Sequence, residues 1–262
     1  METKKVLGRR RFSFTVTTLA FVFLYLPIVA LVVLSFNSAR QGVGWTGFTL
    51  KWYSELFRQT DIWRAFLNTI IIAISSSIAA TIIGTFAALA LYWYQSKLKG
   101  YLGVLVYTPL IIPDILMGVS MLIFFVAIGM PLGLLTIFFA HVTFCVSYVT
   151  VTVMTRLEDF DYSVVEAARD LGAKGYQVFT RVVMPMILPG IMAGFLLSLT
   201  LSIDDFVITF FVAGPGSTTL PLKIFSMIKF GVSPVINALS TLLLIGTLFV
   251  SFFGSKFRKL IF

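Results

Sequence analysis

The sequence predicts an all-α, polytopic membrane protein with six transmembrane helices. Hydrophobic residues make up 58% of the 262 residues and charged residues only 12%, so a soluble globule of this composition would lack the polar surface to cover itself. An apolar run of about 18 or more residues spans a hydrocarbon core about 30 Å thick, at about 1.5 Å per residue. Six such runs occur, at about 12–36, 68–94, 102–128, 132–155, 187–213 and 235–255.

The first run follows Arg9, Arg10 and Arg11, as the apolar segment of a secretory signal would. It extends over residues 12–36, beyond the usual length of about 7–15 residues, and no small-residue cleavage site follows it. We therefore expect it to remain as a membrane anchor.

Basic residues predict the orientation of the spans. With the N-terminus inside, both termini and the loops 95–101 and 156–186 are cytoplasmic, and these segments hold 14 of the 20 Lys and Arg residues, against six outside and none in a span. This bias follows the positive-inside rule and predicts a multi-pass protein of the inner (plasma) membrane. The net charge of +9 then reflects topology and contact with the lipid bilayer, so nucleic acid is not an expected partner.

The third and fourth runs contain unusual residues. Pro109 and Pro113 precede Asp114, and a helix broken by proline at membrane depth is tolerated where it lines a cavity. The alternative is that Asp114 only caps the half-helix that restarts after the break. In the fourth run, His141 and the single cysteine, Cys145, are expected to pack or to form a local hydrogen bond, and we predict no metal site.

Three aspartates, Asp114, Asp204 and Asp205, lie in apolar stretches that contain no Lys or Arg. Each charge costs about 2.5–3.5 kcal/mol at a helix centre, so these carboxylates should face water, one another or a cationic ligand. Ser202 and Asp205 share a helical face with Thr209, and Asp204 points about 100° away from Asp205. A purely structural role for the three carboxylates is the alternative.

The depths of these residues suggest a shape for the ligand. Counted from the cytoplasmic ends, Asp114 lies roughly 18 Å deep and Asp204 roughly 25 Å deep, which predicts a ladder of charge for a linear polycation. Aromatic rings would complete such a path by cation–π attraction, and the candidates are Trp52, Tyr53 and Tyr107. Trp52 is equally well explained as an interfacial anchor.

The loop 156–186 is the longest on the cytoplasmic side. Ser163 and Glu166 have the spacing of a capping box, so a short helix is expected to begin there and to end at Gly172 in the left-handed conformation. A second helical stretch, about 174–183, should stop before Pro185. The segment could be interfacial, but its acidic residues would be repelled by anionic lipid, which favours a protein partner.

Nucleotide binding is not expected in this chain. No lysine is followed by Ser or Thr, so the chain lacks the Walker A loop that cradles phosphates. We therefore expect no cofactor here and no enzymatic activity, and any ATP and Mg²⁺ must be bound by another chain.

Part of this loop resembles the "EAA" motif of ABC importer permeases, EAA-x3-G-x9-I-x-L-P. The matching residues are Glu166, Ala167, Ala168, Gly172, Val182, Met184 and Pro185, with Val and Met in place of Ile and Leu. The remaining chain, including 35–38, 48–53, 199–205, 220–223 and 231–234, is similar to PotC-type permeases of spermidine/putrescine importers.

The resemblance implies a type I ABC importer (MetI-like) permease fold in a single domain, 1–262, with a coupling loop, 156–186, that docks on an ATPase. The implied coupling residues are Glu166, Ala167, Ala168, Gly172 and Pro185. The implied partners are a second permease (PotB-like), two copies of an ATPase (PotA-like) and a periplasmic polyamine-binding protein (PotD-like).

Two other function classes stay open at this point. An ABC permease for another solute would keep the loop but would not need carboxylates in its path. A secondary cation transporter would use the same aspartates, but a single six-span copy lacks the paired repeat of many such folds.

Reporter fusions test the orientation. A reporter that is active only in the cytoplasm should be active when fused after Phe262 and inactive when inserted in the segment 212–234, because an odd number of spans separates the two points. Equal activity at both points would contradict the six-span topology.

Overall fold

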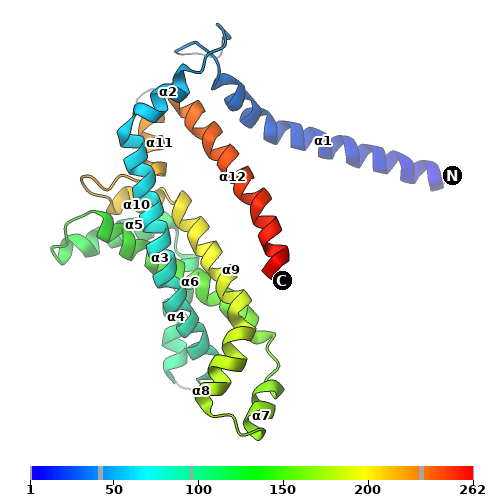
Figure 1. Cartoon of the computed structure of the whole chain (residues 1–262), viewed down its shortest axis with the longest axis vertical. Coiled ribbons are helices and arrows are strands. Elements are labelled where there is room, and N and C mark those ends of the chain that lie inside the picture. Colours follow the sequence, from blue (N-terminus) through cyan, green and yellow to red (C-terminus); the bar gives the residue numbers. More distant parts are fainter. Residues whose placement is uncertain (1, 41–43, 95–96, 230–232, 262) are drawn as a thin grey trace. The chain divides into compact units, whose positions relative to one another are not determined.

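The computed structural model describes residues 2–40, 44–94, 97–229 and 233–261, and every regular element within these ranges is helical (Figure 1). The all-α prediction is therefore confirmed. The elements are, in chain order, α1 (Glu2–Leu34), α2 (Lys51–Arg58), α3 (Thr60–Trp93), α4 (Lys97–Ile111), α5 (Asp114–Ala127), α6 (Leu134–Glu158), α7 (Ser163–Asp170), α8 (Gly175–Val178), the π-helical turn η1 (Phe179–Val183), α9 (Met184–Asp204), α10 (Val207–Val212), α11 (Leu220–Lys229) and α12 (Pro234–Ile261).

The chain forms two compact units. The terminal unit comprises residues 1–60 and 224–262, and the core unit comprises residues 61–223. Within the terminal unit, α12 contacts both α1 and α2. The single domain 1–262 stays a prediction, and each unit is described by itself.

Asn37 organises the loop between α1 and α2 in the terminal unit. Its side-chain oxygen accepts the backbone N–H of Thr46 at 3.0 Å, and its backbone carbonyl accepts the indole N–H of Trp52 at 2.7 Å. The Tyr53 hydroxyl lies 2.7 Å from the Ser35 hydroxyl. Both aromatic residues thus tie the start of α2 to the end of α1.

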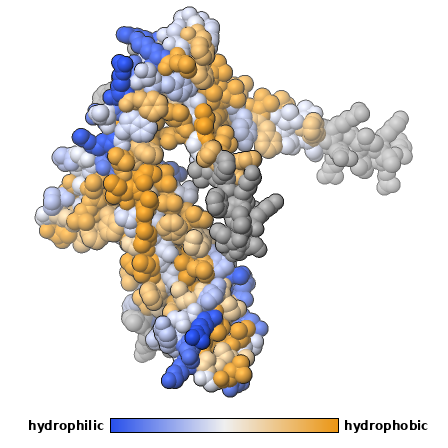
Figure 2. All heavy atoms as spheres, in the orientation of Figure 1, coloured by the Kyte–Doolittle hydropathy of each residue, from blue (hydrophilic) through white to orange (hydrophobic). Residues whose placement is uncertain are grey.

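Four helical segments in the described part of the chain are long and apolar enough to cross a membrane, namely Phe12–Leu34, Thr60–Trp93, Leu134–Glu158 and Gly175–Asp204. The bent pair α4 and α5 makes a fifth if it is counted as one span. Figure 2 shows hydrophobic residues along the middle of the core unit and hydrophilic residues at its end with α7 and α8. The sixth expected span falls in α12, where Pro234–Phe249 is apolar. Most side chains beyond that point lie outside the described residues, so the sixth span stays a prediction.

The third expected span is sharply bent. α4 ends at Ile111, α5 begins at Asp114, and the two helices are bent by 116°. Pro113 has no N–H with which to continue the α4 hydrogen bonds, and its ring disfavours helix at the residue before it. α5 then packs against α10. The predicted break before Asp114 is confirmed, and the structure adds the size of the bend.

The fifth expected span is also divided. α9 ends at Asp204, and Asp205 is extended (φ −62°, ψ 121°) before α10 begins. At its other end the span starts earlier than expected, because α8, η1 and α9 form one helical segment, Gly175–Asp204. The π-type bond from the Met184 N–H to the Phe179 carbonyl widens the turn before Pro185. The prediction that the helix stops before Pro185 is therefore wrong.

Glycines allow three helices of the core unit to approach closely. A Cβ atom at Gly84 of α3 would lie 2.8 Å from Cβ of Val149 on α6 and 3.0 Å from the carbonyl oxygen of Val146. A Cβ atom at Gly194 of α9 would lie 3.3 Å from the Val149 Cγ1 atom. Helix packing in membranes depends on such small residues, since they let backbones come together.

Alanine substitution tests this packing. Gly84→Ala should destabilise the chain by about 1–3 kcal/mol, because neither Val149 nor the α6 backbone can easily move away. Thermal unfolding in detergent should show a lower midpoint for Gly84→Ala. The control is Gly103→Ala on α4, where an added Cβ meets no atom within 4 Å, so its midpoint should equal or exceed that of the wild type. Equal midpoints for Gly84→Ala and the wild type would contradict the packing argument.

Candidate functional site

All three predicted aspartates line one cavity of about 230 Å³ in the core unit. The bend between α4 and α5 and the break between α9 and α10 bring these residues together. The predicted ladder assumed straight helices, and the structure instead gathers the carboxylates around a common space. The lining residues are Pro109, Asp114, Phe144, Tyr148, Leu201, Asp204, Asp205, Phe206, Val207 and Ile208.

Asp114 and Asp204 are exposed, and neither forms an ion pair with a basic residue in the part of the chain that the structure describes. Asp114 is the first residue of α5, and the start of this helix has no side-chain cap hydrogen bond. Capping alone therefore does not explain Asp114, although the positive end of the α5 dipole favours a carboxylate there. Both carboxylates are open to a cation that enters the cavity.

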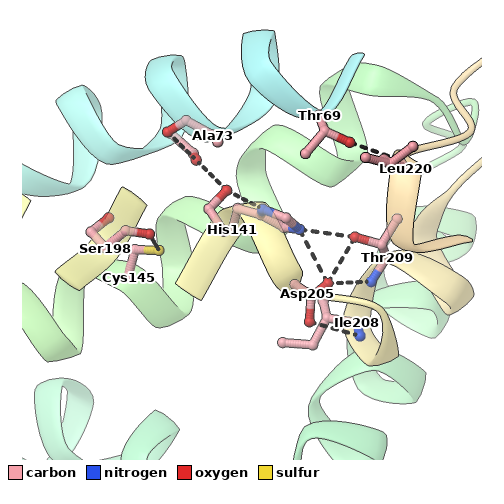
Figure 3. Close-up of polar contacts among 11 residues, drawn as sticks. Thr69, Ala73, His141, Cys145, Ser198, Asp205, Ile208, Thr209 and Leu220 are labelled. Atoms are coloured by element: carbon pink, nitrogen blue, oxygen red, sulfur yellow. Dashed lines mark hydrogen bonds and ion pairs between the residues drawn. The ribbon is translucent and has the colours of Figure 1, made fainter. Parts of the chain in front are cut away.

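Asp205 differs from these two residues, since only 9% of its side chain is exposed. Oδ2 accepts the backbone N–H of Thr209 at 2.8 Å and its hydroxyl at 2.7 Å, and Oδ1 accepts the N–H of Ile208 at 3.3 Å (Figure 3). The carboxylate thus satisfies the free backbone donors at the start of α10. These hydrogen bonds support the structural role that was the alternative to ligand binding for Asp205.

His141 of α6 reaches the same carboxylate. Its Nε2 atom lies 3.3 Å from Asp205 Oδ2 and 3.0 Å from Thr209 Oγ1, and its Nδ1 atom lies 2.7 Å from Ser202 Oγ (Figure 3). These apolar stretches contain no Lys or Arg, and the ring that reaches Asp205 is a histidine from another helix. His141 was expected to pack or to form a local hydrogen bond; its hydrogen bonds instead reach residues 61 and 68 positions away.

Ser202 is buried rather than open to the cavity. Besides His141, its hydroxyl contacts the Ser76 hydroxyl of α3 at 3.2 Å. The predicted face of Ser202, Asp205 and Thr209 is therefore a polar network inside the protein. The helix breaks at Asp205, so the periodicity that placed Thr209 on this face does not continue, yet Thr209 still joins the network.

The predicted aromatic residues are elsewhere. Trp52 is only 4% exposed and, like Tyr53, belongs to the terminal unit, where both form the hydrogen bonds described above. The burial of Trp52 disagrees with a ligand contact. Tyr107 is exposed on α4 but is not among the residues that line the cavity.

Aromatic side chains other than the predicted ones border the cavity. Phe144, Tyr148 and Phe206 line the cavity beside the carboxylates. Sequence reasoning missed them, but a signal was present: Phe144 and Tyr148 follow His141 by three and seven residues, which puts all three on one face of α6.

A larger cavity of about 660 Å³ lies among α4, α5 and α6. Its only polar lining residues are Ser120 and Thr143, so it offers no charge to a polar solute. The smaller cavity, by contrast, has three carboxylates in its wall.

The predicted coupling loop contains the short helix α7, which begins at Ser163 as expected. It is not started by a capping box: the Asp161 carboxylate accepts the backbone N–H of Ser163 at 2.9 Å. The hydrogen bonds from Ser163 hold the pKa of Asp161 below its ordinary value, so the carboxylate stays charged as the pH falls. Glu166 is exposed and free to contact another molecule.

Gly172 ends α7 in the left-handed conformation (φ +82°), as predicted. The N–H of Gly172 bonds to the carbonyl of Arg169 at 2.8 Å, and the N–H of Ala173 bonds to that of Ala168 at 3.0 Å. These two bonds form a Schellman motif, which fixes a sharp exit from the helix. Ala167 and Leu171 are exposed, the latter by 90%, so small and apolar side chains face outward from the loop.

Comparisons with known proteins agree with this architecture. The family model "Binding-protein-dependent transport system inner membrane component" matches residues 80–259. The chain is 43% identical over 228 residues to the spermidine/putrescine transport system permease protein PotC of Escherichia coli strain K12, covering 87% of this chain and 86% of that protein. It is 44% identical over 244 residues to the putrescine transport system permease protein PotI of the same strain, covering 90% and 86%.

Solved structures share the fold at low sequence identity. The MetNI methionine ABC transporter aligns with a TM-score of 0.65 at 20% identity, over 82% of this chain and 100% of that chain. A bacterial ABC transporter involved in the import of alginate aligns with a TM-score of 0.72 at 16% identity, over 94% and 96%. The fold is that of ABC importer permeases, and this chain belongs to the family of inner membrane components of binding-protein-dependent transport systems.

Proposed function

We propose that this chain is the transmembrane permease subunit of an ATP-driven importer that moves polyamines, spermidine or putrescine, into the cytoplasm by alternating access. Relatives that are 41–44% identical over most of the chain are named as spermidine/putrescine or putrescine permeases. The observation that carries the substrate class is the pair of open carboxylates, Asp114 and Asp204, on one cavity.

The chemistry of the cavity fits a flexible polycation. The ammonium groups of a polyamine would supply the positive charge that the cavity wall lacks, and the carboxylates would then avoid the cost of an uncompensated charge in a low-dielectric medium. The rings of Phe144, Tyr148 and Phe206 add a surface on which an ammonium group gains about 0.5–2 kcal/mol by cation–π attraction.

Anionic solutes fit this cavity poorly. A relative that is 29% identical is named as a putative permease for 2-aminoethylphosphonate. A phosphonate would be repelled by Asp114 and Asp204, which argues against such a substrate here. A neutral solute would leave both carboxylates unpaired.

The proposed assembly follows the family. A second, homologous permease (PotB-like) completes the path, two ATPase subunits (PotA-like) bind ATP and Mg²⁺, and a periplasmic binding protein (PotD-like) delivers the polyamine. The N- and C-termini and α7 lie on the cytoplasmic side. Exposed Glu166, Ala167 and Leu171 dock on the ATPase, and Ala168 and Gly172 hold the shape of the loop.

Uptake into vesicles tests the proposed function. Vesicles that contain the whole complex and the binding protein should accumulate labelled putrescine or spermidine only when ATP is present. An importer for another solute would accumulate neither compound. ATP-independent uptake driven by an ion gradient would instead indicate a secondary transporter.

Removal of the cavity charges tests the path. Asp114→Asn and Asp204→Asn should each lower polyamine uptake by about tenfold or more, because each removes one ion-pair partner of the substrate without changing side-chain size. The matched control is Asp61→Asn, which removes a carboxylate that pairs with Lys223 at 3.7 Å outside the cavity. Wild-type uptake by both cavity variants would exclude these residues from the path.

A bulky residue at Gly172 tests coupling. Gly172→Val should weaken binding of the ATPase and lower uptake. A β-branched residue in the left-handed conformation costs more than about 1–2 kcal/mol, so the variant would lose the Schellman motif. Copurification and ATPase activity of the complex measure the effect. Gly175→Ala is the control, because its φ is ordinary and an added Cβ meets no atom within 4 Å. Normal copurification and transport by Gly172→Val would contradict the coupling role.

A further inference from the structure

His141 joins the two halves of the broken fifth span, and the proposed transport cycle leaves it without a role. Nδ1 contacts Ser202 in the last turn of α9, and Nε2 contacts both Asp205 at the break and Thr209 in α10. The residue is 1% exposed and does not line the cavity. It therefore acts on a transported solute only through its neighbours.

The hydrogen-bond pattern fixes the proton of the neutral imidazole. Thr209 gives its hydroxyl hydrogen to Asp205 Oδ2, so both groups near Nε2 are acceptors and Nε2 must carry the hydrogen. Nδ1 is then an acceptor, and the Ser202 hydroxyl donates to it. The Ser76 hydroxyl, which donates to the Ala73 carbonyl at 3.4 Å, lies 3.2 Å from the Ser202 oxygen. A directed chain of donors thus runs from Ser202 of α9 through His141 of α6 and ends on the Asp205 carboxylate.

This chain distinguishes Asp205 from its neighbour in sequence. Asp205 receives hydrogen bonds from Thr209 and Ile208 and faces Nε2–H of His141, although it belongs to the cavity wall. Asp204 is the last residue of α9, directly before the break that His141 bridges, and it is exposed. One carboxylate of the adjacent pair is thus compensated by protein donors, and the other is left for a ligand.

We propose that His141 is a positioning residue that compensates the charge of Asp205 through its Nε2–H, so that Asp114 and Asp204 alone present uncompensated carboxylates to the transported polycation. The inference rests on the proposed polyamine transport. It assigns His141 a part in charge selectivity: without the donor, the wall of the cavity gains a third strongly negative group, which holds a trication more firmly than a dication.

Two amide variants separate the roles of the two ring nitrogens. The Asn amide extends about as far as Nδ1 and the Gln amide about as far as Nε2, so His141→Asn keeps a partner for Ser202 but removes the donor to Asp205, whereas His141→Gln retains that donor. Maximal uptake rates of putrescine and spermidine are measured in vesicles with the whole complex and saturating binding protein, so that passage and release limit the rate.

The expected result is a change in selectivity. His141→Asn should lower the ratio of the spermidine rate to the putrescine rate by about threefold or more, because release of the trication from a more negative cavity slows down. His141→Gln should keep the wild-type ratio. In an Asp205→Asn background, His141→Asn should leave the ratio unchanged, since the histidine acts through that carboxylate.

A second pair of variants covers a failure of His141→Asn to assemble. Thr209→Val removes another donor to Asp205 at nearly constant volume and should shift the ratio in the same direction. Thr150→Val is the control. The hydroxyl of this buried threonine of α6 donates to the backbone carbonyl oxygen of Val146 at 2.7 Å, within its own helix. The Thr150→Val ratio should equal that of the wild type.

Several results would overturn the inference. Equal slowing of both substrates, equal ratios for the Asn and Gln variants, or an undiminished effect of His141→Asn in the Asp205→Asn background would each leave His141 a purely structural residue. These outcomes differ from failure of the proposed function, in which the wild-type complex accumulates neither polyamine.

Discussion

The free-energy cost of a carboxylate in a low-dielectric environment is the constraint on which the core unit depends. A membrane-embedded charge has to be hydrated, paired or hydrogen-bonded. Asp205 meets this requirement within the protein, through Thr209, Ile208 and His141. Asp114 and Asp204 have no basic partner among the described residues and border a cavity instead. The cost is thus offset by protein hydrogen bonds at Asp205, whereas Asp114 and Asp204 need water or a cation in the cavity.

The cavity exists because two spans are broken, and each break frees backbone groups that need partners inside a membrane. Asp205 accepts backbone N–H groups at the start of α10, and side chains of neighbouring helices bond the irregular backbone that follows α10. Thr136 of α6 donates to the Val212 carbonyl at the end of α10, and Thr69 of α3 accepts the N–H of Leu220. Asn68 of α3 donates to the carbonyls of Gly216 and Thr218 in the segment that follows α10. Buried polar residues on α3 and α6 therefore make the irregular backbone tolerable.

Hydropathy and proline positions were sufficient to predict the helical class, four of the six spans, a fifth if the bent pair α4 and α5 is counted as one, and the break before Asp114, because these depend on local composition. The direction of the chain after a break could not be predicted, since it is set by packing: α5 turns by 116° and contacts α10. For the same reason, the sequence indicated the three aspartates but not their common cavity. Counting Lys and Arg also overlooked His141, whose contact with Asp205 spans 64 positions and leaves no local pattern.

The segment Gly175–Asp204 links the coupling loop to the cavity through one continuous run of helix. Its 30 residues correspond to about 45 Å at 1.5 Å per residue, so it extends from the Schellman turn after α7 to the carboxylate of Asp204. Hydrogen bonds and packing make such a helix stiff along its axis, whereas η1 before Pro185 and the Asp205 break are the points where it can bend. A displacement of the loop would therefore reach the last turn of α9 to the extent that η1 does not bend. There it would act on Asp204 and, through Ser202, on the hydrogen-bonded network of His141, so the proposed ATPase-docking loop and the proposed substrate carboxylate adjoin the two ends of the same element.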